Sequence, residues 1–194
     1  MTEKQIPVLT IGLVTTLIGL HWLVVDKTLL YFSAADIWSG EVWRIISGHL
    51  MHADLQHLMW NCLGLAVLGS LLESQSRQLL LATSGAGILF VSALLLTPFS
   101  QLDYYCGLSG VLNTLLLVAL WSQWKLTRSR WIIILAFGSI AKVLIEVSQG
   151  ISMVTQISWP PYAWSHVAGL TGGLAIIWIQ SRGSQDRNRV HAGF

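Results

Sequence analysis

The chain alternates long apolar stretches with short polar connections. Six stretches carry few charges and have about the length of a membrane-crossing helix, about 20 residues; they are residues 6–25, 52–73, 79–97, 107–124, 131–149 and 162–180. Lipid offers no partner for a bare backbone N–H or C=O group, so such stretches are expected to be helices. The pattern predicts an all-α membrane protein, with residues 1–194 forming one six-helix bundle.

Composition supports the same class of protein. Hydrophobic residues make up 54% of the chain and charged residues only 10%, whereas soluble proteins carry about 25% charge. These values exclude a disordered chain, a coiled coil and a soluble enzyme. The net charge of +2 is too small and too scattered to indicate binding to nucleic acid. Cys62 and Cys106 have no metal-binding spacing and are expected to be free thiols.

The basic residues predict the orientation in the membrane. They gather at Lys4, in the connection 125–130 and in the tail that begins at Arg182. The connections 26–49, 98–106 and 150–161 hold two basic residues in all, Lys27 and Arg44. Basic residues favour the cytoplasmic side, so both termini are expected to be cytoplasmic and these three connections to face outside.

Three predicted helices that run from the outside inward begin with unusual polar residues. The second opens with His52, His57 and Asn61, the fourth with Ser109 and the sixth with His166. At a rise of about 1.5 Å per residue, these side chains share the outer half of the bilayer. Polar side chains at this depth face the bundle interior or a wet cavity, which indicates a common site.

The spacing brings these residues to shared helix faces. His57 and Asn61 are four residues apart and lie on one face. His166, Gly169 and Gly173 also share a face, and small residues there allow a neighbouring helix to approach closely. The fourth and sixth predicted helices are therefore expected to pack tightly beside the site.

Ser109 lies between Gly107 and Gly110 at a helix N-terminus, where free N–H groups and the helix dipole suit an oxyanion. Taken singly, Ser109 is typical of a helix cap and His166 of an interhelical hydrogen bond. Together they match the nucleophile and base of an acyl-transfer site.

No carboxylate is predicted to complete a catalytic triad. Glu73 lies 21 residues after His52, roughly 32 Å along a helix and at the opposite membrane face. Nothing in the spacing places Asp54 or Asp103 beside Ser109. The sequence therefore predicts a Ser–His dyad.

Two charged residues, Lys142 and Glu146, lie inside the fifth predicted helix. Their spacing of four residues favours an ion pair whose charged groups reach the outer headgroups. A role in admitting substrate is the alternative. The spacing His49–Leu–Met–His52 lacks the glutamate of an HExxH zinc site, so no metal is expected.

Three motifs in order resemble those of the rhomboid family of intramembrane serine proteases. Residues 48–61 (GHLMHADLQHLMWN) resemble its HxxxxHxxxN pattern, residues 107–110 (GLSG) its GxSG nucleophile motif, and residues 166–173 (HVAGLTGG) its histidine helix. Trp43–Arg44 resembles its WR pair, which is expected to anchor the first outer connection. Glu73 matches its acidic residue on the second helix.

The resemblance implies a six-helix fold with Ser109 as nucleophile and His166 as base. It implies an oxyanion hole made by the Ser109 N–H, Asn61 and His57. The supporting positions it implies are His52, Gly107, Gly110, Asn113, Gly169 and Gly173. Asn113 departs from the aromatic or histidine residue common in relatives, which leaves open what packs against His166.

The chain looks most like the bacterial rhombosortase branch, which is associated with removing C-terminal anchors that contain Gly-Gly. This implies a multi-pass protein of the bacterial inner membrane, with its active site toward the outer side. Its expected partners are the lipid bilayer and a transmembrane-anchored protein substrate, with no cofactor, metal or nucleic acid. The alternatives are a general rhomboid protease with other single-pass substrates, or a haem protein ligated by two of His52, His57 and His166.

Overall fold

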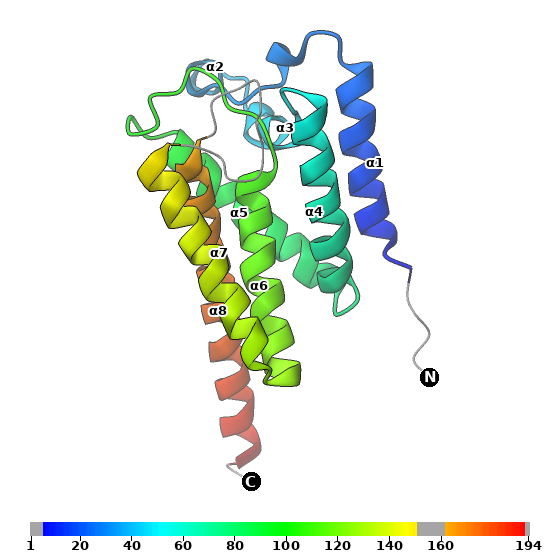
Figure 1. Ribbon diagram of the computed structural model, residues 1–194, viewed down its shortest axis with the longest axis vertical. Coiled ribbons are helices and arrows are strands. Elements are labelled where there is room, and N and C mark those ends of the chain that lie inside the picture. The colour runs from blue at the N-terminus through cyan, green and yellow to red at the C-terminus, as the bar shows by residue number, and fades with distance from the viewer. Residues whose placement is uncertain (1–5, 151–161, 193–194) are drawn as a thin grey trace.

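The computed structural model describes residues 6–150 and 162–192, with side chains described up to residue 183. In this part of the chain the long helices lie side by side as a bundle, with two short helices gathered at one end (Figure 1). The elements, in chain order, are α1 (Val8–Leu23), the 3₁₀-helix η1 (Lys27–Leu29), α2 (Ala34–Trp38), α3 (Arg44–Leu50), α4 (Leu55–Glu73), α5 (Arg77–Leu95), α6 (Ser109–Thr127), α7 (Arg130–Gln149) and α8 (Ala163–Ala192).

Three of the described helices, α4, α5 and α7, are long and apolar enough to cross a membrane. The helix α1 is apolar but has only 16 residues. The helix α6 buries Asn113, Thr114 and Ser122, and such polar side chains lower its hydropathy. The all-helical architecture is confirmed, whereas length and composition identify three spans among the described helices rather than the six expected.

Several helix ends differ from the expected positions, and two of the helices begin where a side chain caps them. The carboxylate of Asp54 accepts a hydrogen bond of 2.8 Å from the N–H of His57, so α4 begins at Leu55 instead of residue 52. Ser76 Oγ accepts a hydrogen bond from the N–H of Leu79, and α5 begins at Arg77 instead of residue 79. The helix α8 continues to residue 192, past the expected end at 180.

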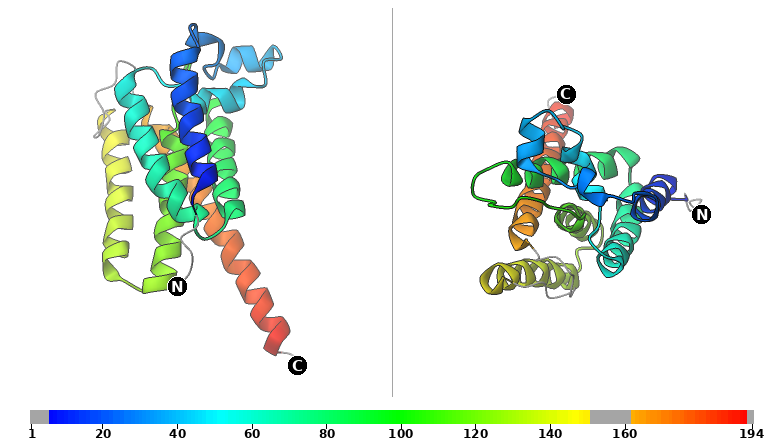
Figure 2. Two further views of the ribbon diagram at one scale, coloured as in Figure 1. Left: turned by 90° about the vertical axis from the view of Figure 1, so that its right-hand side faces the viewer. Right: turned by 90° about the horizontal axis from the view of Figure 1, so that it is seen from above.

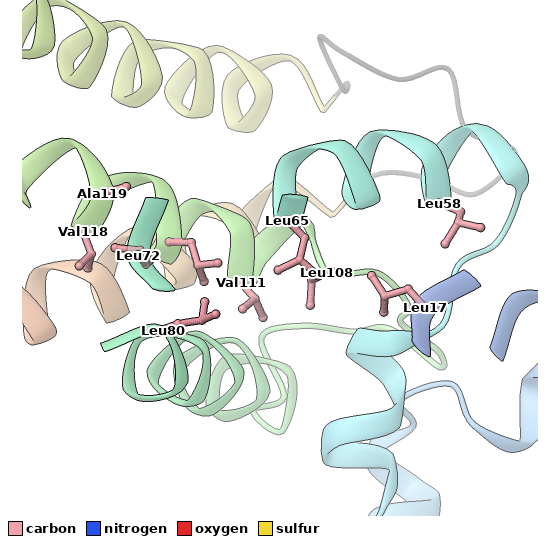
Figure 3. Packing of buried hydrophobic residues seen from close by; sticks show 10 residues of the cluster. Leu17, Leu58, Leu65, Leu72, Leu80, Leu108, Val111, Val118 and Ala119 are labelled. Atoms are coloured by element: carbon pink, nitrogen blue, oxygen red, sulfur yellow. The ribbon is translucent and has the colours of Figure 1, made fainter. Parts of the chain in front are cut away.

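The helix α6 lies at the centre of the bundle. It contacts α4, α5, α7 and α8, and the view from above in Figure 2 shows it among them. Leu58, Leu65 and Leu72 recur every seven residues on α4 and form one stripe of the largest buried cluster. Val111 and Val118 of α6 belong to the same cluster (Figure 3). Burial of these side chains holds α6 in place, and α6 begins at Ser109.

The N-terminus of α1 is held by the last residue of α4, at the end of the bundle opposite α2 and α3. The two carboxylate oxygens of Glu73 accept hydrogen bonds from the N–H groups of Leu9 at 2.9 Å and Thr10 at 2.8 Å. The hydroxyl of Thr10 donates a third hydrogen bond of 2.8 Å. Pro7, which precedes α1, provides no side-chain cap. Glu73 therefore supplies the negative charge that a helix N-terminus favours.

The connection between α1 and α4 is folded around one arginine. Arg44 is 5% exposed, and its Nη1 donates to the carbonyl oxygens of Thr28 at 2.7 Å and Tyr31 at 2.8 Å. Its Nε forms an ion pair of 2.6 Å with Glu41. Trp43 beside it is 51% exposed. The short elements η1, α2 and α3 were not predicted, because helices of three to seven residues carry too little periodicity.

Candidate active site

Four helix ends meet where α2 and α3 lie: α4, α6 and α8 begin there, and α7 ends there (Figure 1). Ser109 is the first residue of α6, and His166 lies in the first turn of α8. Ser109 is half-buried and His166 is buried. The Oγ of Ser109 and the Nε2 of His166 are 3.0 Å apart. Two residues 57 positions apart in the chain are thus within hydrogen-bonding distance.

The helices α6 and α8 touch backbone to backbone beside this pair. A methyl group added at Gly169 of α8 would overlap the carbonyl oxygen of Gly110 in α6. No other residue type fits at position 169 unless the two helices separate. This close approach is what small residues at a helix interface allow, and it brings Ser109 within reach of His166.

The same interface continues away from the site. The hydroxyl of Thr114 donates a hydrogen bond of 2.7 Å to the carbonyl oxygen of Gly169. A methyl group at Gly173 would lie 3.1 Å from the side chain of Leu117. Gly173 therefore has the packing role that its spacing predicted.

Backbone hydrogen bonds hold the loop that precedes Ser109. Phe32 and Tyr105 exchange two such bonds of 2.9 Å, and the N–H of Gly107 donates to the carbonyl oxygen of Gly48 at 3.0 Å. Tyr105 also donates a hydrogen bond of 3.2 Å from its hydroxyl to the Gly107 carbonyl. Burial raises the pKa of Tyr105 to about 12, so the phenol stays neutral. The sequence analysis did not single out Tyr105.

Gly107 has a backbone conformation and surroundings that exclude a side chain. Its φ is +120°, and a methyl group there would collide with the imidazole ring of His57. The ring of His57 on α4 therefore lies against the loop two residues before Ser109.

Asn61 lies on the face of α4 that meets α6. One turn before it, His57 packs on Gly107; three residues after it, a methyl group at Gly64 would lie 2.9 Å from Leu112 of α6. Within the described part of the chain, the buried Nδ2 of Asn61 and Nδ1 of His57 have no hydrogen-bond partner. A buried donor without a partner is rare in native proteins, so these atoms are suited to hold a bound oxygen atom.

His52 is buried and lies behind His57, with the two ring centroids 5.0 Å apart in an edge-to-face contact. Burial lowers the pKa of His52 to about 3, so its ring is neutral. His49 packs elsewhere, with its Nε2 3.0 Å from Ser92 Oγ.

Asn113 lies one turn after Ser109 on α6. Its Nδ2 donates a hydrogen bond of 2.8 Å to the carbonyl oxygen of Ser109. The side chain thus holds the first turn of α6 and takes no part in a hydrogen bond to His166, whose two ring nitrogens contact Ser109 and Glu146.

The expectation that no carboxylate reaches the pair is wrong. The Oε2 of Glu146 lies 2.9 Å from the Nδ1 of His166. The same oxygen accepts a hydrogen bond of 2.8 Å from Lys142 Nζ, so the predicted ion pair is present. The side chain of Glu146 is 0% exposed and that of Lys142 is 32% exposed. The expectation that this carboxylate reaches the outer headgroups is wrong, because it points into the bundle.

Glu146 was not predicted as a partner of His166, because other acidic residues were the candidates for that role. Glu73 contacts α1 at the far end, and Asp54 caps α4. One signal in the sequence could have identified it: Glu146 is an acidic residue near the outer end of an apolar helix, at the same depth as His166. Only the packing of α7 against α8 turns that similarity of depth into contact.

The arrangement is suited to acyl transfer. Ser109, His166 and Glu146 form a continuous hydroxyl–imidazole–carboxylate series, the geometry that activates a serine. Since both ring nitrogens of His166 are engaged, the residue is poorly placed to ligate a haem iron.

One comparison with known proteins supports this chemistry. Comparison with curated proteins gives no match. The family model of the rhomboid domain matches residues 39–183, which is 145 of the 194 residues. The matched region runs from the connection before α3 into α8 and contains every residue of the candidate site. A match of this extent means that the chain belongs to the rhomboid family of intramembrane serine proteases.

Proposed function

We propose that this protein cleaves a peptide bond in or near the membrane anchor of a substrate, with Ser109 as nucleophile and His166 as general base. The observation that carries the proposal is the 3.0 Å contact between Ser109 Oγ and His166 Nε2 at the meeting of three helix N-termini. Membership of a family of intramembrane serine proteases supports it.

The reaction passes two protons through His166, one in each half. In the first half, Ser109 Oγ attacks the carbonyl carbon, a C–O bond forms, and the hydroxyl proton moves to Nε2 of His166. The tetrahedral intermediate then collapses, its C–N bond breaks, and His166 gives the proton to the leaving amine. In the second half, water attacks the acyl-enzyme as His166 takes its proton; the bond to Ser109 Oγ then breaks, the acid leaves, and His166 returns that proton to Ser109.

The oxyanion hole in this proposal consists of the Ser109 N–H, the Asn61 amide and the His57 ring. No side chain of the described residues caps the start of α6, which is consistent with N–H groups that serve a bound anion. The unpartnered Nδ2 donor of Asn61 and the unpartnered Nδ1 of His57 in the described structure support the same role, the latter when that nitrogen carries the ring proton.

We propose that residues 1–194 form one domain with six spans, and that both termini are cytoplasmic. Two cation–π contacts lie away from the site: Arg128 over Trp124 at the end of α6, and Arg182 over Trp178 in the second half of α8. Basic and aromatic side chains are typical of a cytoplasmic membrane interface. This orientation directs Ser109 toward the outer side, the periplasmic side of a bacterial inner membrane.

The proposed substrate is a transmembrane-anchored protein, and the narrower proposal is a C-terminal anchor that contains Gly-Gly. The narrower proposal rests on the resemblance to the rhombosortase branch. The membrane proteome of a deletion strain tests it, with complementation by the wild type or by Ser109→Ala. Retention of Gly-Gly anchors in the mutant is expected; retention only of other single-pass proteins favours a general rhomboid protease.

The catalytic assignment is tested on purified protein in detergent. Ser109→Ala and His166→Ala are each expected to lower kcat by about 10⁶-fold, because neither residue acts without the other. Ser122→Ala is the matched control, since Ser122 is a buried serine on the same helix. It should retain cleavage and labelling by a fluorophosphonate probe. Full activity in Ser109→Ala would reject the assignment.

A further inference from the structure

The proposed function leaves the carboxylate beside His166 without a role. We propose that Glu146 is a positioning residue for His166, so that the site works as a Ser109–His166–Glu146 triad whose acid is supplied by α7. The inference rests on the proposed function, because it assigns a role to the second nitrogen of the proposed base.

The geometry is that of a carboxylate directed at an imidazole. Glu146 Oε2 lies 2.9 Å from His166 Nδ1, while the other ring nitrogen lies 3.0 Å from Ser109 Oγ. Neutral imidazole carries one N–H, and a carboxylate can only accept. Glu146 therefore keeps the proton on Nδ1 and leaves the Nε2 lone pair directed at the serine hydroxyl.

An ion pair that served only to neutralise charge in lipid would have a different geometry. The cheapest arrangement directs both side chains outward to the headgroups. Here the side chain of Lys142 is 32% exposed, but that of Glu146 is fully buried and shares Oε2 between Lys142 and His166. Lys142 offsets part of the cost of burying the carboxylate, and the inward direction of Glu146 is explained by His166.

The packing of α7 points to the same role. Val143 and Glu146 are the buried residues of this helix, and large apolar side chains such as Leu144 and Phe137 are exposed. A helix that buries so little apolar surface has little structural reason to bury a charge. Its one buried ionised side chain is the one that contacts the proposed base.

During acyl transfer the carboxylate stays ionised. When the proton of Ser109 moves to Nε2, the imidazole becomes a cation with its Nδ1–H bonded to Oε2 of Glu146. No proton passes to Glu146 or from Lys142. The carboxylate thus stabilises charge that exists only after the proton transfer, an effect that raises kcat and leaves substrate binding unchanged.

The test compares three variants of residue 146 in purified full-length protein. Glu146→Gln keeps the size of the side chain but removes its charge, and its amide can donate to Nδ1 and favour the wrong tautomer. We expect kcat for a transmembrane substrate to fall by about 10²- to 10⁴-fold with KM unchanged. The rate of fluorophosphonate labelling at Ser109 should fall in parallel. Glu146→Asp restores the charge and should recover part of kcat.

The third variant separates positioning from folding. Lys142→Leu/Glu146→Leu removes both charges, so neither ion is left buried alone, and such replacements are often neutral or stabilising. This double variant should fold at least as well as the wild type and still lose kcat and labelling rate. Glu73→Gln is the matched control: it neutralises another buried carboxylate, far from Ser109, and should retain kcat.

Histidine NMR provides a readout that a structural role would not move. In ¹⁵N-histidine-labelled wild type, His166 should carry its proton on Nδ1, and in Glu146→Gln on Nε2; a His166→Ala sample assigns the signal. Wild-type kcat, labelling and tautomer in both Glu146→Gln and the double leucine variant would overturn the inference. A wild type that neither cleaves nor labels at Ser109 would instead reject the proposed function.

Discussion

Glu73 and Glu146 are the buried acidic residues in the part of the chain whose side chains are described, and they lie at opposite ends of the bundle. Glu73 accepts from two backbone N–H groups and a hydroxyl at the start of α1. Glu146 accepts from Lys142 and faces the imidazole of His166. Arg77, 65% exposed, also lies 3.5 Å from Glu73. Glu73 is thus paired with backbone dipoles, a hydroxyl and a permanently charged arginine, whereas Glu146 faces an imidazole that can gain a proton.

The difference separates a structural carboxylate from one suited to chemistry. The partners of Glu73 do not change charge, so its interaction is constant and contributes to folding. The imidazole beside Glu146 gains a proton during the proposed reaction, so that interaction is strongest when the charge develops. Loss of the Glu73 carboxylate should lower only the stability of the fold. Loss of the Glu146 carboxylate should lower the turnover number.

The ends also differ in how their helices pack. At the site, Gly110 and Gly169 bring the backbones of α6 and α8 together. The helix α7 contacts α6 and α8 but buries little besides Glu146. We therefore expect a rigid interface between α6 and α8 to hold Ser109 and His166. The Glu146 carboxylate belongs to α7, which is packed more loosely. Four predictions test this contrast.

Of these four, the largest effect is expected for Asn61→Ala at the site end. Loss of one oxyanion donor typically lowers kcat by 10²- to 10³-fold. We expect that loss with little change in KM and no change in melting temperature, because Asn61 Nδ2 has no hydrogen-bond partner in the described structure to lose. Steady-state kinetics and thermal unfolding measure the two. An unchanged kcat would mean that Asn61 only packs between the helices and does not stabilise the oxyanion.

The next largest effect is expected at low pH, where the end of the bundle that holds the site should lose folding stability. Burial lowers the pKa of His49 to about 4, from an ordinary value of 6.5. Below pH 6.5 the unfolded chain binds a proton that the folded chain refuses, so stability is complete above pH 6.5 and is lost as the pH falls toward 4. At about 1.4 kcal/mol per pH unit, His49 alone contributes about 3 kcal/mol to this loss, and His52, whose pKa is also lowered by burial, adds to it. Unfolding in detergent from pH 7 to 4 measures it, and His49→Gln should flatten the slope.

A smaller loss is expected for Gly169→Ala. The added methyl group overlaps the carbonyl oxygen of Gly110, so α6 and α8 must separate. Overpacking of this kind typically costs about 1–3 kcal/mol, and cleavage should fall with it. Gly138→Ala is the matched control, since a methyl group there meets no atom within 4 Å. Equal melting temperatures for both variants would contradict the proposed rigid interface.

The smallest effect on the free energy of unfolding is expected for Glu73→Gln. The amide keeps one acceptor but loses the charge at the N-terminus of α1, which is worth about 1–2 kcal/mol in a buried setting. The melting temperature should fall, and kcat per folded molecule should not change. A loss of kcat would mean that the two ends of the bundle are coupled.

Much of the site could be predicted from the sequence, because it depends on residues that are close together along the chain. His57 and Asn61 share a face by their spacing, and Ser109 stands between glycines at the start of a predicted helix. The helix starts were less accurate, since Asp54 and Ser76 cap α4 and α5 through side-chain geometry that hydrophobic pattern does not report. The short helices around Arg44 were missed because three to seven residues carry too little periodicity.

The sequence by itself determined the all-helical class, the order of the long helices and the shared depth of Ser109 and His166. These are one-dimensional properties, set by hydrophobic length and by the position of polar residues along each helix. Only the tertiary structure decided that Glu146 meets His166, because that contact depends on how α7 is rotated and which helix it packs against. The rotation of a helix that buries few side chains is not encoded in its own periodicity.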